Sequence, residues 1–433
     1  MSKAKDLAKF LNKSHSMFHA VKALEDELLA AGYTRLPENG SWDLQEKGNY
    51  YVTRNGSSIL AFQLPERKEL KGLNIVASHS DSPCFKIKPV WKTGNDRYTK
   101  LNVEVYGGLI MSTWFDRPLS IAGRVAIRTE NGIASKLVDF DEDLAIIPNV
   151  AIHQNRQIND GYKYNAQTDL LPLVCTGGDD SFLEDKICQQ LNVKKEDILG
   201  FDLYLYNRTP AYLWGKDEEF ISAPRLDDLE CAYTSLQAFK KAENKKAVNI
   251  YAVFDNEEVG SITRQGMASG FLADTITRIF EALGYSESDK LAVMANSFLV
   301  SADNAHAVHP NHPELYDSGN QSYMNKGVVI KRCASQSYVT DALSEAVIKQ
   351  LAEKGKVPYQ FFANRSDVRG GGTQAAIGSI NISSMAIDIG LPQLAMHSSF
   401  ETAGSRDVDA MIALLAEFYR HTVICDNGSI TLE

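Results

Sequence analysis

The stretch Val248–Gly260 reads VNIYAVFDNEEVG, and the interpretation of the whole chain starts from it. Its first half is rich in β-branched and aromatic residues, which is typical of a buried strand in a sheet covered on both faces. Three carboxylates then follow within four residues, at Asp255, Glu257 and Glu258. Open α/β sheets place their ligand sites where such strands end. Taken alone, however, the stretch favours a solvated acidic turn, because short motifs often match by chance.

The two adjacent glutamates of this stretch need not share a role, because consecutive residues point in different directions. One of Glu257 and Glu258 could bind a metal ion while the other transfers a proton. Hydrolases with two metal ions require this division of labour. The interpretation therefore depends on further metal ligands elsewhere in the chain.

Length and composition limit the class of protein. A chain of 433 residues exceeds what one hydrophobic core usually supports, so we expect two domains. The formal net charge of −10 argues against a nucleic-acid partner and against an anionic membrane surface. No uncharged apolar span reaches the roughly 18 residues of a membrane helix. The six scattered cysteines and the absence of a secretory signal favour a reduced, cytoplasmic location.

Residues 1–84 are expected to form the first part of a catalytic domain. Leu73–Ser78 predicts a strand that ends in the sequence His79-Ser80-Asp81. An imidazole at a strand end is a natural metal ligand, and a carboxylate two residues on can fix its tautomer. The same short pattern also occurs around purely structural histidines, so a structural role stays open here.

Residues 85–212 have a different pattern of hydrophobic and polar residues. Hydrophobic and polar residues alternate in short segments that glycine and proline separate, which predicts antiparallel strands. One helix is expected within them, at Phe182–Leu191. We interpret the segment as an inserted, β-rich second domain. His153 follows one of its expected strands, and its neighbours alone favour an ordinary strand-end histidine.

Residues 213–433 return to alternating strands and helices and are expected to complete the catalytic domain. Asp227 stands at the entrance of a helical segment, where a carboxylate could cap the helix or bridge two cations. Asp303 follows the expected strand Leu299–Ala302, and His397 lies beyond the last clear strand. The expected fold is therefore α/β, with a mixed, mostly parallel sheet and helices on both faces.

Two other segments could carry ligands. Histidines recur at positions 306, 309 and 312, but the prolines among them favour an irregular segment that would not align three rings. The turn Arg369–Thr373 precedes an expected helix, yet it lacks the lysine and hydroxyl residue of a nucleotide-binding loop. We expect this turn to form a wall of a substrate pocket.

Five candidate ligands share one position in the expected fold, because each lies at the end of a strand or at the start of the next helix. In a mostly parallel sheet these positions converge on one edge. Two histidines and three carboxylates suit two divalent ions, with zinc the usual choice and cobalt or manganese feasible. The five residues are His79, Asp227, Glu258, Asp303 and His397.

The segments around these residues resemble the motif set of the aspartyl aminopeptidase family, which are dinuclear zinc metallopeptidases of the zinc-exopeptidase fold type. The resemblance spans nearly the whole chain, in the family's order, with an insertion at the expected place. The five segments read ASHSDSP, PRLDDL, FDNEEVG, SADNAHAVHPN and PQLAMHS.

The resemblance implies a role for each candidate ligand. Asp227 would bridge the two metal ions. His79 and Asp303 would complete the protein ligands of one ion, and Glu258 and His397 those of the other. The implied substrates are peptides, from which one N-terminal residue is removed at a time.

The resemblance also implies roles for residues outside this set. Asp81 would orient His79, and Glu257 would be the general base that activates the bridging water. The inserted segment would be a dimerisation domain in a tetrahedral dodecamer built from dimers. His153 would then reach the active site of a neighbouring subunit.

Substrate preference depends on Lys331, which aligns with the family lysine associated with acidic N-terminal side chains. The segments SDVRGGGT and HSSFE depart from the family patterns, which leaves a broader or different preference open. Two other functions also stay open: a dinuclear-metal amidohydrolase that deacylates N-acylated amino acids, and a catalytically silent assembly scaffold. The acidic cluster argues against the scaffold, because such charges are unfavourable to bury without metal.

Overall fold

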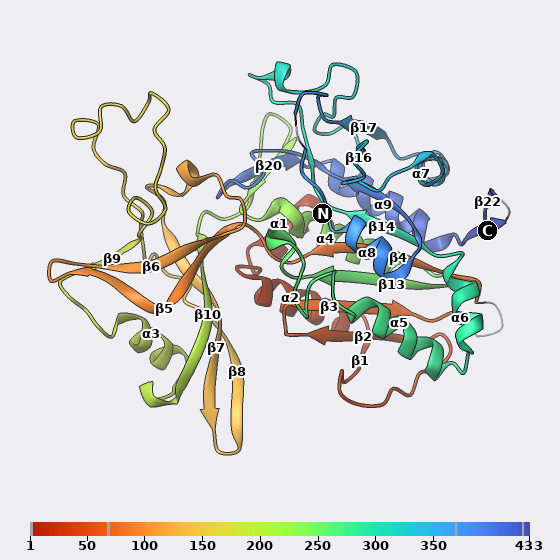
Figure 1. The fold of residues 1–433 in the computed structure, drawn as a ribbon, viewed down its shortest axis with the longest axis horizontal. Coiled ribbons are helices and arrows are strands. Elements are labelled where there is room, and N and C mark those ends of the chain that lie inside the picture. Colours follow the sequence, from red (N-terminus) through yellow and green to blue (C-terminus); the bar gives the residue numbers. More distant parts are fainter. Residues whose placement is uncertain (1–2, 67–69, 369, 427) are drawn as a thin grey trace.

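A nine-stranded sheet is the largest element of the structure, a computed structural model that describes residues 3–66, 70–368, 370–426 and 428–433. Its strand order is β1-β2-β3-β13-β4-β14-β18-β16-β17 (Figure 1). The strands are β1 Thr34–Arg35, β2 Asn49–Arg54, β3 Ser58–Gln63, β4 Gly72–His79, β13 Ala247–Phe254, β14 Phe298–Ala302, β16 Val328–Arg332, β17 Tyr359–Ala363 and β18 Met385–Gly390.

The centre of this sheet is parallel, whereas its flanks are mixed. Strands β13, β4, β14 and β18 pair parallel in that order. His79, the last residue of β4, lies directly opposite Phe254, the last residue of β13. The segments that follow the two strands therefore leave the sheet at the same edge, as the expected fold requires.

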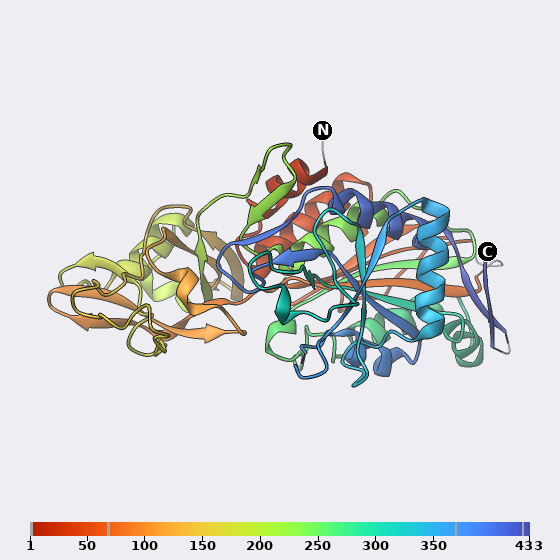
Figure 2. The ribbon, with the colours of Figure 1, turned by 90° about the horizontal axis from the view of Figure 1, so that it is seen from above.

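Helices cover both faces of the large sheet (Figure 2). Residues of β13 divide between two hydrophobic cores, with Tyr251 and Val253 in one and Ile250 and Phe254 in the other. This explains why the strand is apolar at nearly every position. One core is shared with α1 Lys3–Leu11, α2 Met17–Ala30, α4 Leu226–Phe239, α7 Ala342–Gly355 and α9 Asp407–Arg420, and the other with α5 Phe271–Ala282, α6 Glu287–Met294 and α8 Ala375–Ile382. The predicted α/β class is confirmed.

A six-stranded antiparallel sheet lies beside the large sheet (Figure 1). It has its own hydrophobic core, built around Phe85, Leu101, Ile121 and Leu203. Its strands are β5 Cys84–Asn95, β6 Tyr98–Tyr106, β7 Leu119–Thr129, β8 Gly132–Asp139, β9 Leu173–Thr176 and β10 Ile198–Asn207, in the order β8-β7-β10-β5-β6-β9. Helix α3, at Phe182–Leu191, packs against the same core, within the bounds expected from the sequence.

Two smaller sheets complete the described part of the chain. One has the order β11-β12-β20-β19-β15, and the connection between β19 and β20 carries His397. Its strands are β11 Tyr212–Trp214, β12 Phe220–Ala223, β15 Ala305–His306, β19 Pro392–Leu394 and β20 Glu401–Gly404, and the other sheet pairs β21 Val423–Asp426 with β22 Ser429–Leu432. Among the described residues, none of the helices combines the length and apolar character needed to cross a bilayer.

Candidate active site

The carboxyl ends of the central strands open into one cavity of about 370 Å³. The residues that line it come from many separate segments of the chain, and the sequence separates them by up to 318 positions, from 79 to 397. Seven of the nine site residues predicted from the sequence lie on its wall: His79, Asp227, Glu257, Glu258, Asp303, Lys331 and His397.

Asp227 lies at the centre of the candidate ligands. One group of close ligand atoms is formed by His79, Asp227 and Asp303, and a second by Asp227, Glu258 and His397. Within each group these atoms lie within 4.8 Å of one another. The two groups share Asp227, so one carboxylate faces both.

The two histidines present the same ring nitrogen to Asp227. Nε2 of His79 lies 3.5 Å from one carboxylate oxygen of Asp227, and Nε2 of His397 lies 3.3 Å from the other. On the opposite side of each ring, Nδ1 of His79 contacts the carbonyl oxygen of Asp81 at 3.1 Å, and Nδ1 of His397 contacts that of Gly108 at 2.9 Å. A carbonyl accepts only from N–H, so these contacts place the proton on Nδ1 and leave Nε2 free to bind a metal ion.

The buried carboxylates also fit a cation. Oδ1 of Asp227 and Oε1 of Glu258 are buried and have no hydrogen-bond partner among the described residues. Burial raises the pKa of Glu258 well above its ordinary value. A set of two imidazoles and three carboxylates with unpaired oxygens is suited to divalent metal ions.

Glu257 has the environment of a general base. It lies on the cavity wall, and one of its oxygens belongs to a third close group, with His79 and Glu258. Burial, assisted by the charges of Asp303 and Asp81, raises the pKa of Glu257 to about 7. A carboxyl group with a pKa near neutrality can both accept and return a proton at physiological pH.

Asp81 has more contacts than the sequence suggested. Its backbone carbonyl faces His79, and its carboxylate lies 3.5 Å from the same ring. The carboxylate also accepts hydrogen bonds from the backbone N–H groups of Glu257 and Glu258 and from the hydroxyl of Tyr106. Asp81 therefore joins the histidine at the end of β4 to the glutamates after β13.

Two further carboxylates, which the sequence did not single out, accept hydrogen bonds from the backbone N–H groups of the candidate ligands. Glu401 accepts hydrogen bonds from the backbone N–H of Asp227 at 3.1 Å and of His397 at 2.8 Å. Asp228 accepts one from the N–H of His79 at 3.1 Å. Asp228 lies inside the quoted segment PRLDDL, directly after Asp227, and Glu401 ends the segment HSSFE, four positions after His397. Nothing in the sequence shows that they point away from the cavity, so spacing alone could not find them.

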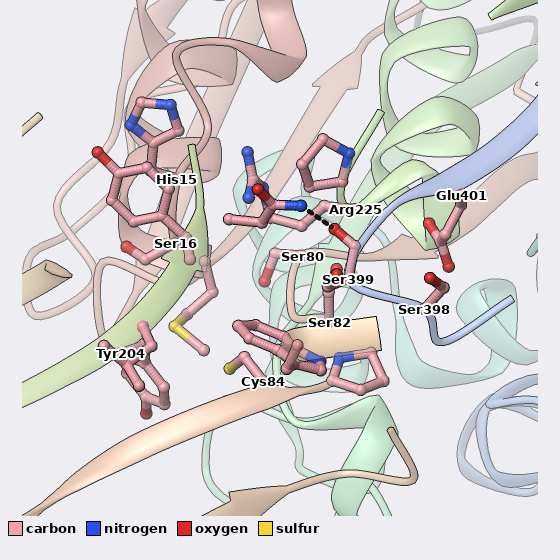
Figure 3. Close-up of a pocket in the computed structure, with 17 residues that line it drawn as sticks. His15, Ser16, Ser80, Ser82, Cys84, Tyr204, Arg225, Ser398, Ser399 and Glu401 are labelled. Carbon is pink, nitrogen blue, oxygen red and sulfur yellow. Dashed lines mark hydrogen bonds between the residues drawn. The ribbon is translucent and has the colours of Figure 1, made fainter. Parts of the chain in front are cut away.

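A second, much smaller cavity lies behind this wall, with Glu401 and Ser398 on one side and His15 and Tyr204 on the other (Figure 3). Its volume of about 30 Å³ is enough for one or two water molecules. Asn207 donates a hydrogen bond to the carbonyl of Ser399 across this region. None of the candidate metal ligands lines this small cavity, whereas all five line the larger one.

His153 lies apart from the candidate ligands. It is exposed, on the connection between β8 and β9, which projects from the six-stranded sheet and is drawn in yellow (Figure 1). It does not line the cavity that contains His79.

The other predicted elements of the cavity wall are present. Gly371, Gly372 and Thr373 line the cavity, as expected for a pocket wall, and Arg369 is outside the described residues. Of the three clustered histidines, His306 lines the cavity, although none of the three belongs to the ligand groups found among the described residues.

Comparison with known proteins identifies a family for the sequence. The family model described as aminopeptidase I zinc metalloprotease (M18) matches residues 10–419. A probable M18 family aminopeptidase 2 from Clostridium acetobutylicum is 42% identical over 424 residues, which are 96% of this chain and 98% of that protein. A protein of the same description from Ectopseudomonas mendocina is 38% identical over 420 residues, with 95% and 97% covered.

Solved structures have the same fold. The structure of the Ape4 and Nbr1 complex matches with a TM-score of 0.92 and 36% identity, over 96% of this chain and 85% of that chain. The structure of the Saccharomyces mApe1 dodecamer matches with a TM-score of 0.84 and 27% identity, over 96% of both chains.

Proposed function

The chain belongs to the M18 family of zinc metalloaminopeptidases, and we propose that it removes N-terminal residues from peptides at a centre for two divalent metal ions. The observation that carries the proposal is the sharing of Asp227 by two groups of ligand atoms. His79 and Asp303 would hold one ion with Asp227, and Glu258 and His397 would hold the other. Zinc suits this mixture of nitrogen and oxygen ligands best, with cobalt and manganese as alternatives.

The residues of the cavity divide the remaining tasks. Bound divalent ions would supply Lewis-acid polarisation of the attacking water and of the peptide carbonyl. Glu257 accepts the proton of that water and returns it to the amine that leaves when the peptide bond breaks. Asp81 holds His79 and the backbone of Glu257 in fixed relation, so base and ligand keep their distance during the reaction.

The proposal extends to an assembly in which the six-stranded sheet, within the insertion at residues 85–212, forms a dimer interface. The mApe1 neighbour is described as a dodecamer, which supports an assembly of this kind, and we propose a tetrahedral dodecamer of dimers. His153 is flanked by the exposed apolar side chains of Val150 and Ile152, which are 53% and 47% exposed. Apolar groups of this kind favour burial against another protein surface. In the assembly, His153 would contact the substrate of a neighbouring subunit.

Hydrolysis of matched peptides tests the proposed reaction. The metal-loaded enzyme should cleave peptides with a free N-terminus, should lose activity with a chelator and should regain it with Zn²⁺ or Co²⁺. A requirement for an acylated N-terminus would support the deacylase instead. Failure to bind any divalent ion at micromolar concentration would support the silent scaffold. A cytoplasmic location stays a prediction of the sequence.

The acidic substrate preference implied by the family resemblance also stays a prediction. It requires the ammonium group of Lys331 to be available to the substrate. A panel of peptides with acidic and neutral N-terminal residues measures this preference directly.

A further inference from the structure

Two N–H donors without an acceptor belong to the wall of the small cavity behind the candidate active site (Figure 3). They are Nε of Arg225 and Nε1 of Trp114, which are buried and have no hydrogen-bond partner in the described part of the chain. Guanidinium and indole N–H groups can donate a hydrogen bond but cannot accept one. Buried donors in folded proteins are nearly always paired, so an acceptor is expected in this cavity.

The guanidinium of Arg225 uses few of its donors. A guanidinium has five N–H groups, yet among the described residues Arg225 makes a single hydrogen bond, from Nη2 to the carbonyl oxygen of Leu11 at 3.3 Å. Its central carbon lies 5.9 Å from the ring centre of Tyr206, where the cation–π attraction is weak. A positive charge enclosed by protein without a counter-ion is unfavourable.

Two carboxylates border this region, but each has other partners. Asp139 accepts a hydrogen bond from the hydroxyl of Tyr206 at 2.7 Å and lies 2.6 Å from Nδ1 of His15. Glu401 lies on the cavity wall and accepts hydrogen bonds from two backbone N–H groups. Neither carboxylate contacts the guanidinium of Arg225, so its charge is left for a further anion.

The size and place of the cavity limit what can bind. A volume of about 30 Å³ suits a chloride ion, which is only slightly larger than a water molecule, but not a sulfate or a phosphate. The wall combines Tyr204 and Asn207, on β10 of the six-stranded sheet, with His15 before α2 and Ser399 between β19 and β20. An ion bound here would therefore contact both main parts of the fold.

We propose that this cavity binds one small monovalent anion of the halide type, with Arg225 as its charged partner, and that the anion stabilises the junction between the six-stranded sheet and the catalytic domain. The guanidinium supplies both the charge and a directional hydrogen bond. The remaining space can hold a water molecule that links the ion to other polar groups of the wall. Anion binding here requires neither metal ions nor a peptide, so it goes beyond the aminopeptidase reaction.

Bromide tests the site directly, because it substitutes for chloride and can be located by its anomalous X-ray scattering. Crystals of the zinc-loaded wild-type enzyme, grown without halide and soaked in bromide, should show an anomalous peak within hydrogen-bond reach of the Arg225 guanidinium. Bromide only at the metal ions or on the surface would overturn the proposal. A water molecule in the cavity without an anomalous peak would overturn it as well.

Thermal unfolding measures the same binding in solution. At constant ionic strength, replacement of gluconate by chloride should raise the melting temperature of the wild-type enzyme by about 1–2 °C. The rise should saturate, with half of it reached below about 100 mM chloride. Sulfate, which is too large for the cavity, should give no saturable rise. An equal rise with sulfate, or no rise with chloride, would contradict a halide site.

Arg225→Gln removes the charge but keeps a hydrogen-bond donor, and it should lose most of the saturable rise. Arg406→Gln, at an exposed arginine just before α9, is the matched control and should keep the rise in full. An unchanged chloride response in Arg225→Gln would overturn the proposal. The bromide map of the wild-type enzyme decides the question even if Arg225→Gln does not fold.

Discussion

The carboxylate of Asp81 accepts a hydrogen bond from the backbone N–H of Glu257 at 3.1 Å. Its second oxygen accepts from the N–H of Glu258 at 3.2 Å and from the hydroxyl of Tyr106 at 2.7 Å. Asp81 thus fixes the turn that carries both the proposed base, Glu257, and a proposed metal ligand, Glu258. These hydrogen bonds join two segments that are 176 residues apart in the sequence.

Asp81→Asn should weaken this connection, because an amide keeps only one acceptor oxygen, and its NH2 group would face either the N–H of Glu257 or the N–H of Glu258. We expect kcat or zinc affinity to fall about 10- to 100-fold. Steady-state kinetics and zinc titration measure the two effects. Tyr106→Phe removes only one of the hydrogen bonds and should have a clearly smaller effect. Equal effects of the two variants would show that the hydrogen bond of Asp81 with Tyr106, rather than its hydrogen bonds with the turn, accounts for the loss.

Glu257→Gln should lower kcat about 10²- to 10⁴-fold, because the amide cannot accept the proton of the attacking water. Metal content, measured on the purified protein, should stay at the wild-type value. Glu243→Gln changes an exposed glutamate in the same way and should have no effect. Full activity of Glu257→Gln would remove this residue from the mechanism.

Metal removal should destabilise the protein as well as inactivate it. Without cations, the unpaired carboxylate oxygens of Asp227 and Glu258 stay buried. We expect the melting temperature to fall by roughly 5 °C with a chelator and to recover with zinc, as for any ligand that binds only the folded state. In His397→Ala, which lacks one proposed ligand, the chelator should lower the melting temperature by less than in the wild type. An identical response in this variant would show that the stabilising ion binds elsewhere.

The proposed exchange of His153 between subunits can be tested by mixing two inactive variants. His153→Ala lacks the residue given to the neighbour, and Glu257→Gln lacks the base of its own site. After dissociation and reassembly of an equimolar mixture, a site needs its own Glu257 and a neighbour's His153, so about a quarter of wild-type activity should return. No recovery, with reassembly verified by light scattering, would mean that the two residues do not act across subunits.

Stability should decline in mild acid partly because of His19. Burial lowers the pKa of His19 to about 4, whereas an unfolded chain has a histidine pKa of about 6.5. Protons therefore bind the unfolded state more readily, so stability is complete above pH 6.5 and is lost as the pH falls toward 4. Comparison of the apoprotein with apo His19→Gln by urea unfolding at pH 7 and 4.5 should show a smaller loss in the variant, by up to about 3 kcal/mol. Parallel losses would show that His19 is not buried as a neutral ring.

Local patterns of the sequence were enough to predict the large sheet. The apolar run of β13 predicted a strand covered on both faces, and its residues do alternate between two cores. Alternating residues predicted the antiparallel strands between Cys84 and Asn207. Side-chain periodicity reflects which faces of an element are buried, so it can be read without knowledge of the partners.

The supporting contacts could not be predicted in this way. Glu401 and Asp228 hold ligands through backbone N–H groups, and Asp81 holds two glutamates through theirs. Nor could spacing show that Nζ of Lys331, a residue of the cavity wall, donates to the carbonyls of Asp303 and Asn304. The direction of a side chain depends on the elements packed around it, and these come from distant parts of the chain.

By itself, the sequence determined the α/β class, the positions of the strand ends and the types of residue placed there, because these follow from local periodicity and from side-chain chemistry. Only the tertiary structure decided that Asp227 faces both histidines, that Asp81 joins the end of β4 to the glutamates after β13, and that Lys331 donates to the carbonyls of Asp303 and Asn304. The physical reason is that metal binding and selectivity depend on distances of a few ångströms between residues hundreds of positions apart, and packing alone fixes those distances.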